Sequence, residues 1–239
     1  MTQVDLNSPV GTWVAAHPQT SRVFEALQIE YCCGGGTSLE QACWDRELDP
    51  QQVMEQLQEV ITEDDDSTES WLNAPLTELC DHIEQTHHAY LREELPRLTE
   101  MVAKVVAAHG ENHPELATVQ EVFNSLRAEL EPHMFKEEQV LFPAIRQLEQ
   151  SADDPSFPFG TVANPIRMME QEHDDAGYAL SRLHTLTRDY HIPEGACNTY
   201  RAMLAGLRHL EKDMHRHVHK ENSILFPRAI ELERSRVPS

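Results

Sequence analysis

The sequence has little glycine and no runs of β-branched residues separated by turn pairs. Only 9 of its 239 residues are glycine, whereas leucine, alanine, glutamate and glutamine are abundant. These abundant residues favour helices, and the missing patterns are those that mark strands. The composition therefore predicts an all-α protein, long enough for one large domain or for a large domain with a small one.

Positive charge is also scarce. The chain has 19 lysines and arginines against 41 aspartates and glutamates, which gives a formal net charge of −22 at pH 7. Nucleic-acid phosphates and anionic membrane surfaces would be repelled, so neither is an expected partner. No stretch of 18 apolar residues is present, and the first residues lack the basic and apolar regions of a secretory signal.

Cysteine is present only in a pattern that does not suit disulfides. There are 5 cysteines, an odd number, and two of them, Cys32 and Cys33, are neighbours. A disulfide framework would show an even number at spaced positions. Together with the lack of a signal segment, this pattern predicts a cytoplasmic protein.

One segment reads as a linker between two domains. Residues 62–70, TEDDDSTES, are acidic and polar and contain no apolar side chain. We therefore expect a small helical N-terminal domain over residues 1–61, an acidic linker over residues 62–70, and a large helical domain over residues 71–239.

The small domain shows four helix signals around a glycine turn. Helices are expected over residues 8–16 and 20–28, a capping box at residues 37–40 opens a third, and Asp49-Pro50 starts a fourth. The turn YCCGGG, residues 31–36, holds the cysteine pair, and its three glycines permit positive φ.

The large domain is predicted to be a four-helix bundle. Helices are expected over residues 75–109, 114–150, 164–190 and 193–233, and their short connections favour an up-down-up-down arrangement. An apolar stripe marks the buried face of each helix. The stripe of the second comprises Val119, Val122, Leu126, Leu130, His133, Glu137, Val140 and Leu141. That of the fourth comprises Tyr200, Met203, Leu207, Leu210, Met214, His217, Glu221 and Ile224.

Two segments of the chain repeat each other within these stripes. HMFKEEQVLFP begins at His133 and HVHKENSILFP at His217, and both read His-x-x-Lys-Glu. A histidine and a glutamate four residues apart lie about 6 Å apart along a helix axis, nearly on one face. Two facing helices would thus bring the imidazoles of His133 and His217 and the carboxylates of Glu137 and Glu221 to one point. This combination favours iron or manganese over structural zinc.

The other two helices should complete the site with one histidine each. His173 lies in line with the apolar residues of the third helix. In the first helix, the upstream stripe of Leu76, Leu79 and Ile83 favours His87. The interval to His173, which nearly equals the interval between the two repeated segments, favours His88, as do the downstream Leu91 and Leu95. We expect His88, with His87 as the alternative.

Two carboxylates are candidates to accept the second N–H of a metal-bound imidazole. Glu129 lies one helical turn before His133, and Glu172 adjoins His173. Metal-bound histidines usually donate their other N–H to such an acceptor. Ordinary surface charge is the alternative for each residue.

Five segments together resemble the iron–sulfur cluster repair di-iron proteins. They are YCCGGG, HHAYLREELP, HMFKEEQVLFP, EQEHDDAG and HKENSILFPRA. In that family a short N-terminal domain with a Cys-Cys pair precedes a haemerythrin-like bundle. The resemblance implies two iron ions per chain, bridged by carboxylates and by an oxo or hydroxo group. The family's ligands match His88, His133, Glu137, His173, His217 and Glu221. Arg92, four residues after His88, matches a family arginine.

The resemblance also implies a function. The family repairs iron–sulfur clusters damaged by oxidative or nitrosative stress, so proteins with damaged clusters are the expected partners. Iron would be supplied from the di-iron site, with Cys32 and Cys33 acting in iron transfer or redox chemistry. O₂, NO and peroxide are the expected small ligands. The alternatives are a nitric oxide reductase or denitrosylase, and a haemerythrin-like O₂ or NO sensor. The oligomeric state stays open, a homodimer included.

Overall fold

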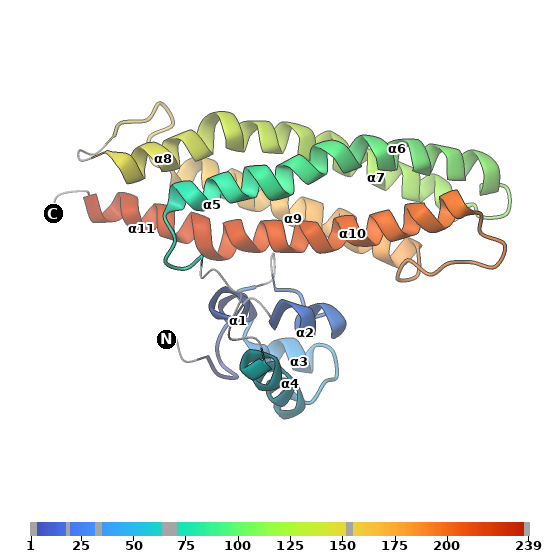
Figure 1. Ribbon diagram of the computed structural model, residues 1–239, viewed down its shortest axis with the longest axis horizontal. Helices are drawn as coiled ribbons and strands as arrows, with labels where there is room; N and C mark the ends of the chain where they lie inside the picture. Colours follow the sequence, from blue (N-terminus) through green and yellow to red (C-terminus); the bar gives the residue numbers. More distant parts are fainter. Residues whose placement is uncertain (1–3, 18–19, 32–34, 64–70, 152–154, 237–239) are drawn as a thin grey trace. The chain divides into compact units, whose positions relative to one another are not determined.

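The computed structural model describes residues 4–17, 20–31, 35–63, 71–151 and 155–236 (Figure 1). These residues form helices joined by turns and contain no β-strand, which confirms the predicted all-α class. Among them, no helix combines the length and apolar character needed to cross a membrane. Cys32, Cys33 and residues 64–70 of the predicted linker lie outside the described residues.

The last two of the four N-terminal helices begin at a capping side chain. The four are α1 (Val10–Ala16), α2 (Ser21–Ala26), α3 (Leu39–Trp44) and α4 (Pro50–Glu63). Helix α3 is capped by Ser38, whose Oγ accepts from the Gln41 N–H at 3.3 Å, so the cap lies one residue later than the predicted box. Asp49 accepts from the Gln51 N–H at 2.9 Å, and Pro50 takes the first helical position.

The glycine turn serves close packing where it is described. The sequence indicated only that the three glycines permit a positive φ, and Gly36 does not adopt one. A Cβ atom on Gly35 would instead lie 2.4 Å from the backbone oxygen of Tyr31. Gly35 also accepts a hydrogen bond from the Gly11 N–H at 2.9 Å. Glycine is therefore needed at position 35 because two backbones approach there.

Four long helical segments make up the rest of the chain. The first comprises α5 (Leu76–Ile83), η2 (Glu84–His88) and α6 (Ala89–His109). The second comprises α7 (Glu115–Lys136), η3 (Glu137–Leu141) and α8 (Phe142–Gln150). The third is α9 (Ala163–Leu186), and the fourth comprises α10 (Asn198–Lys220), η4 (Glu221–Leu225) and α11 (Phe226–Arg236). This is the four-helix bundle that the stripes predict (Figure 1).

Three of these segments contain a π-helix, which the sequence reading did not foresee. The π-helices η3 and η4 are followed by Phe142-Pro143 and Phe226-Pro227. Proline has no N–H and clashes with the carbonyl four residues earlier, which lies inside each π-helix. A widened turn before the proline relieves this clash, so the repeated Leu-Phe-Pro favours η3 and η4, although α6 and α7 accommodate Pro96 and Pro132 within α-helix.

The π-helix also corrects one predicted core residue. Val140 was expected in the buried stripe, but its side chain is 42% exposed, whereas Leu141 is buried. The wider turn of η3 rotates residues after Glu137 relative to an α-helix. The stripe therefore continues through Leu141 and omits Val140.

The third and fourth segments are shorter than predicted at the loop that joins them. Helix α9 ends at Leu186 instead of residue 190, because Arg188, Asp189 and Tyr190 have φ of 52°, 56° and 55°. Left-handed residues cannot continue a right-handed helix. Helix α10 begins at Asn198 instead of residue 193, after Gly195 with φ of 79°.

The chain divides into two compact units. Unit 1 comprises Met1–Cys80, Ile145–Val162 and His215–Ser239, and unit 2 comprises Asp81–Ala144 and Ala163–Met214. In unit 2, α7 packs against both α9 and α6. In unit 1, the Glu149 carboxylate accepts from the N–H groups of Leu76 and Thr77 at 2.6 and 2.8 Å, and so caps α5.

We predict that Glu149→Gln destabilises the metal-free protein by about 1 kcal/mol at pH 7, the usual cost of losing a helix cap. Burial alone would raise the pKa of Glu149, but hydrogen bonds from Thr77 and Leu76 outweigh it and lower the pKa. The carboxylate therefore stabilises the fold above the unfolded-state pKa of about 4.3, and this stabilisation is lost as pH falls through the lower folded value. Urea unfolding at several pH values should show the two proteins converging in acid, whereas exposed Glu55→Gln should match the wild type throughout.

Candidate metal centre

The six side chains predicted to bind metal are all buried. Their exposed fractions lie between 0% and 2%. They are His88 at the end of η2, His133 in α7, Glu137 at the start of η3, His173 in α9, His217 in α10 and Glu221 at the start of η4. Buried polar side chains of this kind are stable only when they are paired or bind an ion.

These six residues form two groups that share both glutamates. The first group is His88, Glu137, His217 and Glu221, and the second is His133, Glu137, His173 and Glu221. In each group the four ligand atoms lie within 4.8 Å of one another. Each group thus offers two imidazoles of its own and two shared carboxylates.

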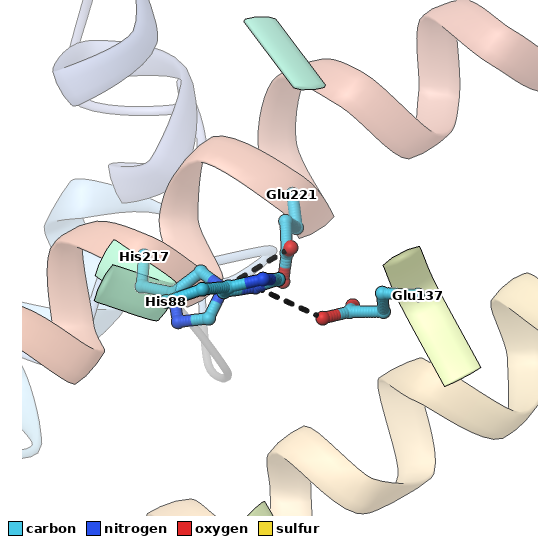
Figure 2. Close-up of side chains that lie close together, drawn as sticks. All are labelled: His88, Glu137, His217 and Glu221. Carbon is cyan, nitrogen blue, oxygen red and sulfur yellow. Dashed lines mark hydrogen bonds and ion pairs between the residues drawn. The ribbon is translucent and has the colours of Figure 1, made fainter. Parts of the chain in front are cut away.

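The Glu137 carboxylate lies between the two groups. Its Oε2 is 3.3 Å from Nε2 of His88, and its Oε1 is 3.3 Å from Nε2 of His133. Figure 2 shows Glu137 and Glu221 pointing toward His88 and His217. The His217 Nε2 lies 3.2 Å from Oε1 of Glu221 on the same helical segment. A carboxylate with one oxygen toward each group has the geometry of a bridge between two ions.

The opposite nitrogens of two histidines contact a second pair of carboxylates. Nδ1 of His88 lies 2.7 Å from Oε1 of Glu138, which also pairs with Arg92. Nδ1 of His133 lies 2.8 Å from Oε2 of Glu172, which also pairs with Lys136. The same carboxylate–histidine arrangement therefore occurs once in each group.

Both outer carboxylates are held in the ionised form. Burial alone would raise the pKa of Glu138, but the hydrogen bonds from Arg92 and His88 outweigh it and lower the pKa. Burial opposes ionisation of Glu172 in the same way, and Lys136 and His133 likewise lower its pKa. An ionised carboxylate only accepts hydrogen bonds, so Nδ1 of His88 and of His133 carries the hydrogen.

The tautomer with the hydrogen on Nδ1 makes His88 and His133 suitable as metal ligands. In the neutral form with the hydrogen on Nδ1, each imidazole would direct the lone pair of Nε2 inward. For His88 that lone pair faces a carboxylate oxygen of Glu137, and for His133 it also faces Nε2 of His173 at 3.1 Å. Lone pairs and carboxylate oxygens repel one another unless a cation lies among them. The donor set contains nitrogen and oxygen and no thiolate, as iron sites with histidine and carboxylate ligands do.

The structure explains why the sequence favoured both His87 and His88. The upstream stripe of Leu79 and Ile83 is in register with position 87, and the downstream stripe of Leu91 and Leu95 is in register with position 88. The π-helix η2 lies between the two stripes and adds one residue to the turn, so both registers hold. His88 faces Glu137, whereas Nδ1 of His87 lies 2.9 Å from Oδ1 of Asp213 on α10.

Of the two candidate outer carboxylates, the structure places only Glu172 beside a histidine of the site. Glu129 is exposed, and its carboxylate accepts a hydrogen bond from Ser125 at 3.3 Å. Nδ1 of His133 lies 2.8 Å from Oε2 of Glu172, which belongs to α9. Glu138 was not predicted from the sequence. Arg92 is a signal for it, because an arginine one turn after a metal ligand is expected to pair with a nearby carboxylate.

The remaining predicted residues are not part of these groups. Cys32 and Cys33 lie outside the described residues. His219 is buried, and its ring lies edge-on to Tyr31 with the centroids 5.5 Å apart. His215 lies 3.7 Å from the Glu30 carboxylate. Both contacts fall within unit 1.

Comparison with known proteins gives two family matches and close relatives. Residues 81–229 match the hemerythrin HHE cation binding domain, and residues 6–61 match a domain of unknown function, DUF542. The chain is 37% identical over 224 residues to the iron-sulfur cluster repair protein YtfE of Yersinia pseudotuberculosis serotype IB. The match covers 94% of this chain and 97% of that protein. The YtfE protein of Yersinia pestis strain Pestoides F is similar at the same identity and coverage.

We predict a ranking of iron affinity among glutamate variants. Glu138→Ala and Glu172→Ala should each weaken Fe²⁺ binding about 10- to 100-fold, the usual effect of losing a histidine's outer partner. Glu137→Ala and Glu221→Ala should cost more, because each removes a ligand from both groups. Titration of metal-free protein with Fe²⁺ under anaerobic conditions measures this ranking. Glu129→Ala is the matched control and should bind like the wild type, and equal loss in all five variants would refute the assignment.

Proposed function

Because the chain belongs to the iron–sulfur cluster repair family with a haemerythrin HHE cation-binding domain, we propose that it holds two iron ions and repairs damaged iron–sulfur clusters. The observation that carries this proposal is the pair of buried groups that share Glu137 and Glu221. Two groups with separate histidines and common carboxylates suit two ions at short separation. The relatives named as cluster repair proteins support the same role.

Each iron would be held by two histidines and by one oxygen from each bridging glutamate. His88 and His217 would hold one ion, and His133 and His173 the other. Four protein ligands are fewer than an octahedral ion accepts, so positions stay open for an oxo or hydroxo bridge and for O₂, NO or peroxide. Bound iron supplies the redox chemistry and the metal to be delivered.

The charges around the groups suit iron in its divalent form. Glu137 and Glu221 supply two negative charges between the groups, and Glu138 and Glu172 supply two more behind the histidines. Arg92 and Lys136 offset the charges of Glu138 and Glu172, so the two inner carboxylates would lower the charge of two Fe²⁺ ions from +4 to +2 in the buried site. The neutral imidazoles bind more weakly than thiolates would, which favours a site that can release its metal.

Iron supply to the damaged cluster is the step that we propose for this chain. Cys32 and Cys33 would act in the transfer and not in holding the iron, because the six bundle side chains already offer four ligands to each group. A thiolate binds iron where a thiol does not, so transfer requires ionised cysteine. The partners would be proteins whose clusters have been damaged by oxidants or by nitric oxide.

The proposed roles in iron delivery and iron storage correspond to the predicted domains. We propose that residues 1–61 deliver iron through the cysteine pair and that residues 71–239 store it, with residues 62–70 as the link. The two family matches, over residues 6–61 and 81–229, support this division. Cys43 and Cys197 carry thiols and not disulfides, which supports a reducing compartment such as the cytoplasm.

We predict two irons per chain in protein produced with ample iron. Metal analysis should give close to two irons and little zinc, because the groups hold nitrogen and oxygen donors only. The double variant Cys32→Ser, Cys33→Ser should keep both irons and the same visible spectrum. One zinc per chain, or loss of iron in the double variant, would contradict the assignment.

We predict that the iron-loaded protein restores an oxidised [4Fe–4S] dehydratase faster than an equal amount of free Fe²⁺. The Cys32→Ser, Cys33→Ser protein should restore it poorly, although it carries the same iron. Nitric oxide consumption is measured in parallel with the same preparations. Rapid reduction of nitric oxide without cluster recovery would favour a nitric oxide reductase or denitrosylase, and reversible gas binding alone would favour a sensor.

A further inference from the structure

Among the three π-helices, η2 needs an explanation of its own. A proline follows each of η3 and η4 after one residue, and its clash with the carbonyl four residues earlier favours their wide turns. No proline follows η2 at that position, since residue 90 is tyrosine. A π-helix is rare and less favourable than an α-helix, so η2 must be stabilised by a contact outside its own backbone.

Placing a histidine in the site does not itself require a π-helix. His173 reaches its group from α9, which is α-helical from Ala163 to Leu186. His88 in the first segment corresponds to His173 in α9, because the interval between them nearly equals the interval between the two repeated segments. The cause of η2 therefore lies in residues that differ between the two segments, and His87 is the neighbour of His88 that is also buried.

His87 and Asp213 form the contact that suits this role. His87 is 2% exposed, and its Nδ1 lies 2.9 Å from Oδ1 of Asp213 on α10. The second oxygen of Asp213 is buried, and among the described residues no hydrogen-bond partner reaches it. The His82 ring lies edge-on to the His87 ring, with the centroids 5.9 Å apart. His87 thus contacts a carboxylate of another helical segment and a ring of α5.

The contact requires the π-helical register. In an α-helix, positions 87 and 88 point about 100° apart, and only one of them continues a given stripe. In this chain both side chains are buried and both have specific partners, Asp213 for His87 and Glu137 for His88. The extra residue of η2 offsets the two apolar stripes by one position. Position 87 is therefore in register with Ile83, and position 88 is in register with Leu91.

We propose that His87 and Asp213 are positioning residues that hold η2 as a π-helix and thereby fix His88 at its metal group. The inference rests on the proposed iron site and deepens it. Asp213 lies four residues before His217 on α10, and His87 directly precedes His88, so each member of the pair is close in the chain to a histidine of the first group. The second group, with His133 and His173, has no share in this contact.

The first test removes the Asp213 carboxylate. We expect Asp213→Ala to lose iron from the first group and to fall from two irons to about one per chain, with helix content unchanged. Glu211→Ala is the matched control, because Glu211 is a partly buried carboxylate on the same helix that pairs with His184 at 3.4 Å. The control should keep two irons. Two irons in Asp213→Ala would overturn the proposal.

A second variant tests whether Asp213→Ala loses iron through a change of helical register or through a general loss of stability. Gln85 is an exposed residue of η2, and its deletion removes the extra residue of the turn. The helix can then run α-helical from Ile83 to Leu91 with His88 facing the site, without help from Asp213. We expect the deletion to restore two irons to Asp213→Ala. Failure of this rescue, with the deletion alone keeping two irons, would show that the pair acts by another route and would overturn the proposal.

Two further measurements complete the design. The deletion should not rescue His88→Ala, which lacks the ligand itself and should stay near one iron. Amide hydrogen exchange of the metal-free protein should be faster across residues 84–88 in Asp213→Ala than in wild type or Glu211→Ala. Unchanged exchange there would count against the proposal. This readout needs no iron, so failure of the wild type to bind iron would refute the proposed function and leave the role of the pair testable.

Discussion

The structure depends on the cost of burying two carboxylates and four imidazoles at one place. Glu137 and Glu221 are fully buried, and the inward nitrogens of His88 and His133 present lone pairs to Glu137. Such an arrangement is unfavourable for the protein alone and favourable around cations. The long helices, the capping of α5 and the outer carboxylates all serve to hold these six side chains in position.

The outer carboxylates set the chemistry of the site as much as the inner ones. Glu138 and Glu172 fix the tautomers of His88 and His133, and Arg92 and Lys136 keep these carboxylates ionised. In each case a basic side chain pairs with a carboxylate, and this carboxylate contacts the imidazole of a candidate metal ligand. A charge change at the surface would therefore alter the electron donation of a ligand.

The sequence predicted the fold class and the six central residues because both depend on regular spacing. The constant interval between the repeated segments and the four-residue steps from histidine to glutamate are properties of straight helices, and the six side chains do converge. The residues and helix ends that were predicted wrongly lie where the chain departs from regular α-helix. Val140 and the conflict over His87 came from π-helices, and the early end of α9 came from left-handed residues at 188–190. Glu138 was missed because its role depends on contact across helices.

The two metal groups take their histidines from both halves of the repeat. The first group combines His88 with His217, the second combines His133 with His173, and each also needs Glu137 and Glu221. No continuous fragment that stops short of Glu221 contains a full group. During synthesis, neither group can assemble until the last of the four helical segments has emerged and folded. An ion bound by these groups would therefore enter late, and newly made protein would pass through a period in which no ion stabilises the polar centre.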